Sequence, residues 1–221
     1  MSRAPRPVLS LFLLSSSMLS HPASAMTLGQ IATTAATAHP AAFESTETVA
    51  TGVEDRTPQW QQVKRQLGKD MTQLQHCLDD ATNCTGSAMQ MWREMVTTLT
   101  DKDANTKLQT VNVFFNRWQY RADEGKDHWA GPIEFMQNSG DCEDYAIAKY
   151  TTLLFLGMRD EQMRITAVQD MNRGGIAHAV LSVTTENGNE ILDNLSDIAY
   201  DGQRANGYVP RFAVNQSGTY I

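Results

Sequence analysis

The chain lacks an apolar run long enough to cross a membrane, and its basic residues are outnumbered by acids. The apolar stretch over residues 8–20 is shorter than the roughly 20 residues that a spanning helix needs, and Ser15, Ser16 and Ser17 interrupt it. The 221 residues hold 18 lysines and arginines against 25 acids, a formal net charge of −7, and no internal repeat. An acidic chain is a poor candidate for nucleic-acid binding. We therefore expect a protein that is not membrane-embedded and binds no nucleic acid.

The first 25 residues have the pattern of a secretory signal peptide. Arg3 and Arg6 precede the apolar run, and the small residues at 23–25 supply a cleavage site. Met26 follows this site, and the lack of a cysteine there argues against a lipid-anchored bacterial protein. We expect residues 1–25 to be removed on export to the periplasm. Loss of the two arginines changes the formal charge from −7 to −9, which is 16 basic residues against 25 acids.

Cysteine is scarce, and its three copies divide into a pair and a single residue. Cys77 and Cys84 lie close in sequence, where an oxidising compartment would let them pair across the end of one helix and the start of the next. Two free thiols are the alternative. In either case an odd cysteine, Cys142, is left over, and a leftover thiol in an exported protein indicates reactivity.

The pattern of apolar residues predicts an α+β fold. Residues 26–55 form a loose N-terminal segment, 56–130 a helical lobe, and 131–221 a catalytic helix with an antiparallel sheet. Apolar residues three or four apart predict helices from Thr57-Pro58 (Trp60, Val63, Leu67, Met71, Leu74, Leu78), from Ser87 (Met89, Trp92, Val96, Leu99) and over 105–120 (Leu108, Val111, Phe115, Trp118). A short helical turn is expected over 133–136, followed by a helix that begins within residues 140–150 and ends at Gly157. Four strands are expected over 164–168, 177–184, 190–193 and 208–214.

Residues 140–150 read GDCEDYAIAKY and place one thiol among carboxylates. Cys142 falls at the start of a predicted helix, where backbone N–H groups and the helix dipole favour a thiolate. The neighbouring acids Asp141, Glu143 and Asp144 oppose a thiolate, because negative charge raises the pKa of a thiol. The alternative is a purely structural role, in which Asp141 caps the helix and the other two acids are solvated on its first turn.

Two further residues complete the parts of a cysteine-type triad. His178 lies on a predicted strand with apolar neighbours, and Asp193 ends the next strand. A thiol nucleophile, an imidazole base and a carboxylate that orients it are the components of such a site. Each has an ordinary alternative, since a lone strand histidine usually belongs to a core or surface and an aspartate before asparagine usually belongs to a turn.

The hairpin between these strands offers a geometric test. A tight turn at Asn187-Gly188 would place His178 opposite Asp197, with Asp193 four residues away along the strand, about 13 Å. We reasoned that a working triad needs His178 and Asp193 directly opposite each other. The prediction is therefore a wider loop centred near residues 185–186, or a bulge.

Five stretches make the chain similar to a known family. The motif GDCEDYAIAKY, the upstream FFNRWQY and DHWAGPIEF, and the downstream AHAVLSV and ILDN resemble the bacterial transglutaminase-like cysteine proteinases. Within that family the chain looks most like periplasmic proteases that release large biofilm adhesins. The resemblance covers about residues 108–200. It implies a papain- or transglutaminase-like core in which a nucleophile-bearing helix packs on an antiparallel sheet, with an N-terminal helical lobe.

The resemblance also implies roles for particular residues. Cys142 would be the nucleophile, His178 the base and Asp193 the orienting acid. Calcium would be bound beside the nucleophile by Asp141 and Glu143, with Asp144 as a further ligand, since all three carry the oxygen donors that a hard cation prefers.

The implied substrate is the N-terminal region of a large surface adhesin, cut at a pair of alanines so that the biofilm disperses. The implied inhibitor is an inner-membrane cyclic di-GMP receptor of the LapD type. Two other functions remain open. The same thiol would serve a transglutaminase or amidase, and without catalysis the acids would make a calcium-binding module that holds a partner.

Overall fold

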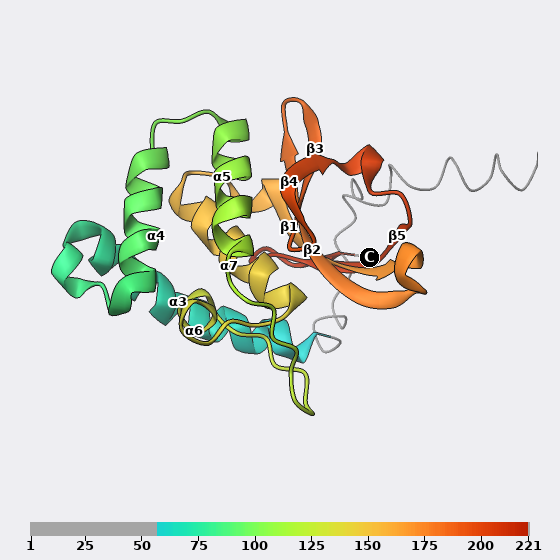
Figure 1. Cartoon of the computed structure of the whole chain (residues 1–221), viewed down its shortest axis with the longest axis horizontal. Helices are drawn as coiled ribbons and strands as arrows, with labels where there is room; N and C mark the ends of the chain where they lie inside the picture. The colour runs from blue at the N-terminus through green and yellow to red at the C-terminus, as the bar shows by residue number, and fades with distance from the viewer. Residues whose placement is uncertain (1–56, 221) are drawn as a thin grey trace, which may run out of the picture.

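The computed structural model describes residues 57–220, in which a layer of helices covers one face of an antiparallel sheet (Figure 1). The helices are α3 (Pro58–Asp79), α4 (Gly86–Leu99), α5 (Ala104–Asn116), α6 (Pro132–Asn138) and α7 (Cys142–Phe155). The strands are β1 (Met163–Asp170), β2 (Ile176–Thr185), β3 (Gly188–Asp193), β4 (Ser196–Asp201), β5 (Tyr208–Val214) and β6 (Thr219–Tyr220). This is the predicted α+β fold. The expected signal peptide and loose N-terminal segment lie outside the described residues.

The first two helices form where the apolar spacing predicts them. Thr57 and Pro58 begin α3, and α4 buries the four predicted residues, Met89, Trp92, Val96 and Leu99. The buried face of α3 differs from the prediction at two places: Asp70 and Cys77 are buried, whereas Met71 and Leu78 are only half-buried. Cys77 and Cys84 form the predicted disulfide, which joins the end of α3 to the start of α4. Cys142 is the free cysteine.

The third helix is shorter than its apolar pattern indicated. We predicted a helix over 105–120, but α5 ends at Asn116. The chain leaves the helix because Tyr120 pairs with Gly140 as an isolated parallel bridge, and the Arg121 N–H donates to the Gly140 carbonyl at 2.8 Å. This pairing holds the segment after α5 against the residues that precede α7.

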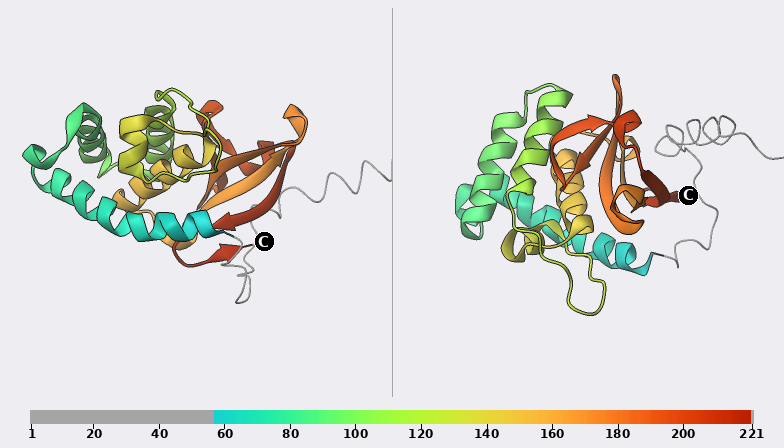
Figure 2. Two further views of the ribbon diagram at one scale, coloured as in Figure 1. Left: turned by 90° about the horizontal axis from the view of Figure 1, so that it is seen from below. Right: turned by 45° about the vertical axis from the view of Figure 1, so that its right-hand side comes forward.

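Two glycines fix the bounds of α7. At Gly140 a Cβ would fall 2.1 Å from the Asp144 Oδ2, so that only glycine lets the Asp144 side chain fold back over the helix start. Gly157 follows the last turn with a φ of +87°, a left-handed conformation that glycine adopts without steric cost. Between them α7 packs on β2 and β1 with one face and contacts α5 and α6 with others (Figure 2). The helix that carries Cys142 is therefore buried in the middle of the protein.

The sheet has six antiparallel strands in the order β4-β3-β2-β1-β5-β6. The four predicted strands correspond to β1, β2, β3 and β5, and the prediction missed β4 and β6. β4 was missed because its sequence alternates weakly: Ile198 is exposed and only Ala199 is fully buried. β6 has two residues, too few to show a period. No helix in the described part of the chain is both long and apolar enough to cross a membrane.

The hairpin between β2 and β3 differs from the predicted wide loop. Thr185 pairs with Gly188, so the turn is a tight two-residue turn at Glu186-Asn187. The pair Leu181–Leu192 sets a register in which His178 and Asp193 are offset by two residues on the same face of the sheet. Diagonal neighbours of this kind remain within reach of long side chains. The prediction was wrong because it required the two residues to be directly opposite.

Candidate active site

The thiol of Cys142 lies half-buried at the first position of α7. Its Sγ donates to the Glu143 Oε2 at 3.2 Å, and the backbone N–H of Ala179 on β2 is directed at the same sulfur. Burial raises the pKa of the Cys142 thiol, and the charges of Glu143 and Asp141 raise it further, while the Ala179 amide lowers it in part. In this structure the sulfur is therefore held as a thiol by its acidic neighbours.

His178 and Asp193 form a buried pair on adjacent strands. The His178 Nε2 lies 2.9 Å from the Asp193 Oδ1, and the two residues are 5% and 2% exposed. Because Nε2 faces the carboxylate, the Nδ1 of the ring is left for another partner. The residue that follows His178 on β2 is Ala179, whose backbone amide lowers the pKa of Cys142 in part, so β2 brings His178 to the neighbourhood of Cys142.

Two tyrosines that the sequence did not single out hold Asp193 in place. The hydroxyls of Tyr208 and Tyr200 donate to the Asp193 Oδ2 at 2.7 and 3.1 Å, and the Leu195 N–H donates to the Oδ1 at 2.9 Å. Burial alone would raise the pKa of Asp193, but the hydrogen bonds from these groups and from His178 lower it overall. Asp193 is thus kept as an anion that faces the imidazole. In the sequence, nothing about Tyr200 and Tyr208 beyond their being aromatic residues indicated this role.

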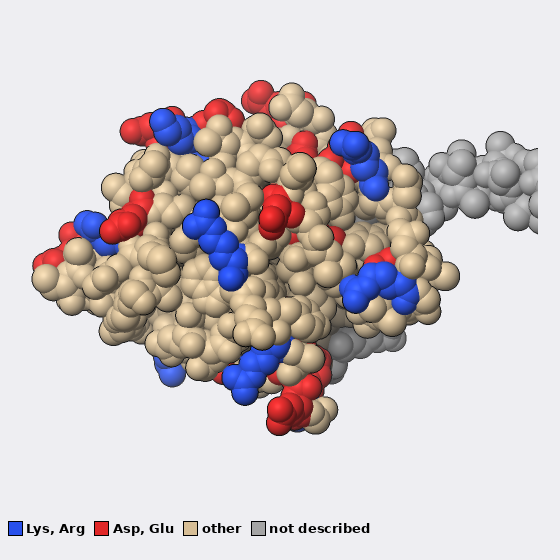
Figure 3. Space-filling model, viewed as in Figure 1, with Lys and Arg blue, Asp and Glu red and all other residues tan. Residues whose placement is uncertain are grey.

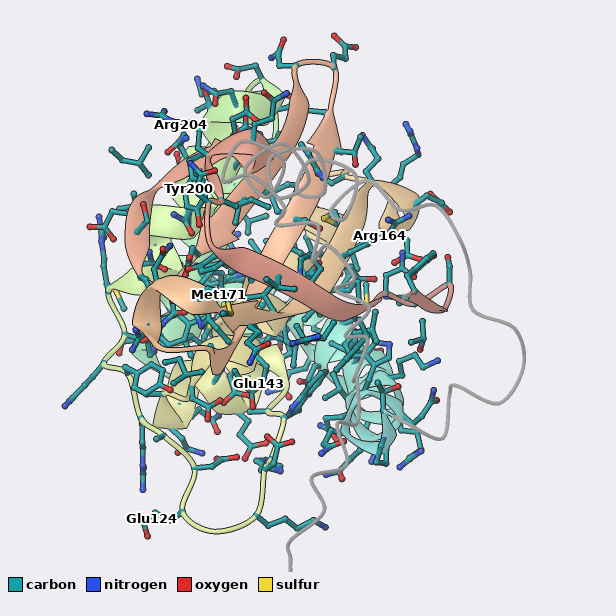
Figure 4. The ribbon with its side chains drawn as sticks, turned by 90° about the vertical axis from the view of Figure 1, so that its right-hand side faces the viewer. Glu124, Glu143, Arg164, Met171, Tyr200 and Arg204 are labelled. Atoms are coloured by element: carbon teal, nitrogen blue, oxygen red, sulfur yellow. A yellow bond between two sulfur atoms is a disulfide. The ribbon has the colours of Figure 1, made fainter. Side chains whose placement is uncertain are left out.

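A group of four carboxylates surrounds the start of α7, and two of them come from a distant loop. Glu143 and Asp141 are the predicted members. Asp123 and Asp127, in the loop between α5 and α6, each bring a carboxylate oxygen so close to Glu143 that these three ligand atoms lie within 4.8 Å of one another. Figure 4 shows this loop, which carries Glu124 at its tip, on the same side of the molecule as Glu143. Acidic side chains gather at the loop tip in Figure 3.

Burial and the neighbouring acids disfavour the charged forms of the carboxyl groups in this acidic group. Burial raises the pKa of Glu143 to about 9, and its contacts with Asp141 add to the shift. Burial also raises the pKa of Asp141, as do the charges of Asp123 and Asp127. The Asp141 Oδ1 is buried and has no hydrogen-bond partner among the described residues. Several convergent carboxylate oxygens and an unpartnered one are what a hard divalent cation such as Ca²⁺ requires.

Asp144, the third predicted ligand, has a different place. Its Oδ1 accepts the Ala130 N–H at 2.6 Å and its Oδ2 the Asp141 N–H at 3.1 Å. Burial raises the pKa of Asp144 to about 7, although both amides lower it. The structure therefore brings Asp144 to the backbone of the helix start and of the segment before α6, and not into the acidic group.

The sequence missed Asp123 and Asp127 as members of the acidic group. They lie 20 and 16 residues before Glu143, outside the motif, in the stretch RADEGKDH. The density of acids in that stretch was a usable signal, but its position relative to Glu143 depends on the bridge between Tyr120 and Gly140. In the structure the loop is also tied to α3, because the Gln59 side chain donates to the Asp127 Oδ2 at 2.7 Å.

Fold and site together define a class of enzyme. A thiol at the start of a helix, packed on an antiparallel sheet whose adjacent strands carry a paired histidine and aspartate, is the arrangement of papain-like and transglutaminase-like thiol enzymes. The chain belongs to the bacterial transglutaminase-like cysteine proteinase family, whose family model matches residues 64–219. It is a cysteine protease of this type. No curated protein matches the chain in sequence.

Solved structures of LapG from Legionella pneumophila resemble the chain in sequence and fold. A calcium-bound form is 30% identical, with a TM-score of 0.61, and the match covers 67% of this chain and 87% of that one. Another LapG structure gives the same identity and coverage with a TM-score of 0.60. An EGTA-treated form gives 30% identity and a TM-score of 0.60, over 67% of this chain and 84% of that one.

Proposed function

We propose that Cys142, His178 and Asp193 are the catalytic triad of this protease. In that scheme the His178 Nδ1 takes the proton of the Cys142 thiol, and the sulfur attacks the carbonyl carbon of the scissile peptide. The S–C bond forms, the oxyanion accepts the Cys142 backbone N–H, and the C–N bond breaks as His178 returns the proton to the leaving amine. Water then hydrolyses the thioester. Asp193 holds the imidazole with Nε2 protonated, so that Nδ1 can accept the proton.

The observation that carries this proposal is the buried His178–Asp193 pair. Two titratable side chains that are 5% and 2% exposed are seldom buried together without a specific role, and β2, the strand of His178, also carries Ala179, whose backbone amide lowers the pKa of Cys142 in part. The tyrosines on Asp193 keep it anionic and fixed. A base that is oriented and excluded from water beside a helix-borne thiol suits acyl transfer.

Calcium is the proposed cofactor, with Asp141 and Glu143 as ligands together with Asp123 and Asp127. The support is the convergence of their oxygens, the unpartnered Asp141 Oδ1, and the calcium-bound LapG structure that resembles the chain. A bound cation reverses the sign of the local field, which favours the thiolate over the thiol. With its oxygens bound to the cation, Glu143 would no longer accept the hydrogen bond from the Cys142 thiol.

The proposed substrate is the N-terminal region of a large surface adhesin, cut at a pair of alanines to release the adhesin and disperse a biofilm. We place the enzyme in the periplasm after removal of residues 1–25, under control of an inner-membrane cyclic di-GMP receptor of the LapD type. The support is the signal-peptide pattern, the resemblance of the motif, and the likeness to LapG.

The test is cleavage of a candidate adhesin N-terminal fragment by the mature chain, residues 26–221. Wild type with calcium should yield two fragments by mass spectrometry, whereas Cys142→Ala and wild type in EGTA should yield at least a hundredfold less product, since each removes the nucleophile or its activation. A higher-mass cross-linked product would indicate a transglutaminase instead. Biological activity unchanged in Cys142→Ala would indicate a calcium-binding module.

A further inference from the structure

One edge of β2 is unpaired next to the nucleophile. On its other side, β2 pairs with β1 from Ile176 to Val183, which includes all of the residues that lack a partner on the β3 side. Its pairing with β3 starts at Thr185 and ends at Leu181, because β3 turns into β4 at Asp193. Residues 176–180 therefore have no strand beside them on the β3 side in the part of the chain that the structure describes. Ile176 and Ala177 are also exposed.

The register shows which backbone groups face this open edge. In antiparallel pairing, residues whose N–H and C=O point to a given neighbour alternate along the strand. The two-residue turn makes Thr185 and Gly188 a hydrogen-bonded pair, so the odd-numbered residues of β2 point toward β3. Ala179 and Ala177 continue this series past the last pair. The Ala179 backbone amide lowers the pKa of Cys142 in part, which agrees with this alternation.

We propose that the edge of β2 at Ala177 binds the main chain of an extended peptide substrate as an added strand. The inference rests on the proposed function, because it places a substrate beside Cys142. The Ala177 N–H and C=O would pair with one substrate residue. Ala177 and Ala179 are two residues apart, about 6.6 Å along the strand. The substrate carbonyl that the Cys142 sulfur attacks would therefore belong to a residue within one or two positions of the substrate residue that pairs with Ala177. An unfolded segment fits, because a folded one has no free backbone groups.

Side chains around the edge suit such a peptide. Met171 and Ile176 are exposed apolar residues at the two ends of the turn from β1 to β2, and Figure 4 shows Met171 on the face that carries Glu143. Tyr120 is exposed, and its backbone pairs with Gly140, two residues before Cys142. Burial raises the pKa of its phenol, and the charges of Cys142 and Asp141 add to this shift. These side chains would contact alternate residues of the peptide while β2 holds its backbone.

The first experiment measures how fast peptide chloromethyl ketones alkylate Cys142 in the calcium-loaded enzyme. The attacking sulfur forms an S–C bond and chloride leaves. The probe is acetyl-tetra-alanyl chloromethyl ketone, compared with four analogues that carry one N-methyl group each. Loss of a single hydrogen bond to the Ala177 carbonyl should slow labelling about tenfold at one position and much less at the others. Equal rates for all four analogues would overturn the proposal.

The second experiment removes the protein's own donor. Ala177→Pro deletes an N–H that points away from β1, so it breaks no bond of the sheet. Ala177→Val adds bulk but keeps the N–H. The proline variant should react with the peptide ketone about fivefold more slowly than the valine variant, while both react with iodoacetamide at similar rates. Equal peptide rates in the two variants would refute the docking edge.

The outcomes separate this inference from the proposed function. If neither reagent labels Cys142 in wild type, the triad proposal fails, whereas labelling without sensitivity to N-methylation rejects only the edge. Analytical sedimentation of wild type and Ala177→Pro tests whether a second copy of the chain occupies the edge instead. A dimer in wild type that is absent in Ala177→Pro would show that a second copy covers the edge, and would overturn substrate docking. If Ala177→Pro does not fold, the N-methyl series decides alone.

Discussion

At the residue scale, the site holds carboxylates of the same chemistry in opposite states. Asp193 is as buried as Glu143, yet its pKa is lowered, whereas burial raises the pKa of Glu143 to about 9. The difference lies in their partners. Asp193 accepts hydrogen bonds from two tyrosines, an amide and an imidazole, while Glu143 faces Asp141 and a thiol. Donors stabilise an anion and other carboxylates destabilise it. One acid is thus prepared to orient a base, and the other to receive a cation.

Asp193→Asn should lower kcat about 10³- to 10⁴-fold. The tyrosines both donate to the Oδ2, so the amide oxygen of asparagine would take that position. Its NH₂ group would then face the His178 Nε2 and place the imidazole proton on Nδ1, where it cannot accept the thiol proton. Peptide cleavage by the purified variant measures this. Tyr200→Phe, which removes one hydrogen bond, is the control and should lose at most about tenfold. Near-normal turnover by Asp193→Asn would contradict the role of Asp193.

Asp123→Asn and Asp127→Asn should each weaken calcium binding at least tenfold, because each removes an anionic oxygen from the acidic group. Isothermal titration calorimetry of the metal-free protein measures the dissociation constant. Glu124→Gln is the matched control, since Glu124 is exposed on the same loop but belongs to neither carboxylate cluster. It should bind calcium as wild type does. If all three variants bind alike, the loop does not contribute ligands.

At the scale of elements, a buried polar chain ties α7 to the turn after the triad acid. Lys149, in the middle of α7, is fully buried, and its Nζ donates to the Asn112 Oδ1 on α5 at 2.8 Å. The Asn112 side chain then donates to the Ser196 carbonyl at 2.7 Å, and Asn116 donates to the carbonyls of Asp193 and Ser196. Thus the helix that carries the nucleophile and the turn that follows Asp193 are fixed to one another through α5.

Lys149→Met should remove part of the pH dependence of stability. Burial lowers the pKa of Lys149 from 10.5 to about 7, although the charges of Asp193 and Asp197 raise it in part. Between these two values the unfolded chain binds more protons than the folded one, so stability rises with pH. The slope is at most about 1.4 kcal/mol per pH unit, and it is lost below pH 7.

Urea unfolding at pH 7.5, 8.5 and 9.5 measures this effect. The difference in free energy of unfolding, wild type minus Lys149→Met, should increase by about 1 kcal/mol for each unit of rising pH. Lys107→Met is a suitable control, because this lysine binds the Leu156 carbonyl from a partly exposed position. Parallel curves for Lys149→Met would show that Lys149 titrates normally.

At the scale of the whole molecule, one hydrophobic core joins the helical lobe to the sheet. Its buried residues come from every helix and from β1, β2, β3, β4 and β5. Buried polar contacts cross the same boundary: the Trp60 indole donates to the Asn215 carbonyl at 2.9 Å, and the Trp92 indole to the Thr152 hydroxyl at 2.9 Å. We therefore propose that 56–130 and 131–221 are lobes of one folding unit rather than independent domains.

A fragment of residues 131–221 should accordingly not fold by itself. It would expose the faces of α7 that α4 and α5 cover and lose the contact of Trp60 with the C-terminal segment. Circular dichroism in urea should show no cooperative transition for the fragment, against a single transition for residues 26–221. A cooperative transition of the fragment would show that the catalytic helix and sheet form a domain.

Most elements and the candidate triad residues could be predicted from sequence, for local reasons. The apolar spacing around Trp92 defines α4, and the placement of Cys142 after Gly140-Asp141 defines a helix start. Errors arose where a distant contact overrides the local pattern. The third helix ends early because Tyr120 pairs with Gly140, and the weakly alternating β4 forms because β3 offers it an edge. The predicted register between β2 and β3 was also wrong, because the local sequence did not fix whether the hairpin turn lies at residues 186–187 or elsewhere.

The sequence by itself determined the kind of chemistry, a thiol at a helix start with a histidine and an aspartate on strands, and it predicted the disulfide between Cys77 and Cys84 that the structure contains. These follow from patterns that span a few residues, where backbone geometry is set locally. Only the tertiary structure decided that Asp123 and Asp127 join Glu143, that two tyrosines hold Asp193, and that Ala177 lies on an open edge. Each depends on packing between segments far apart in the chain, where a shift of one residue in strand register would move every side chain to the opposite face.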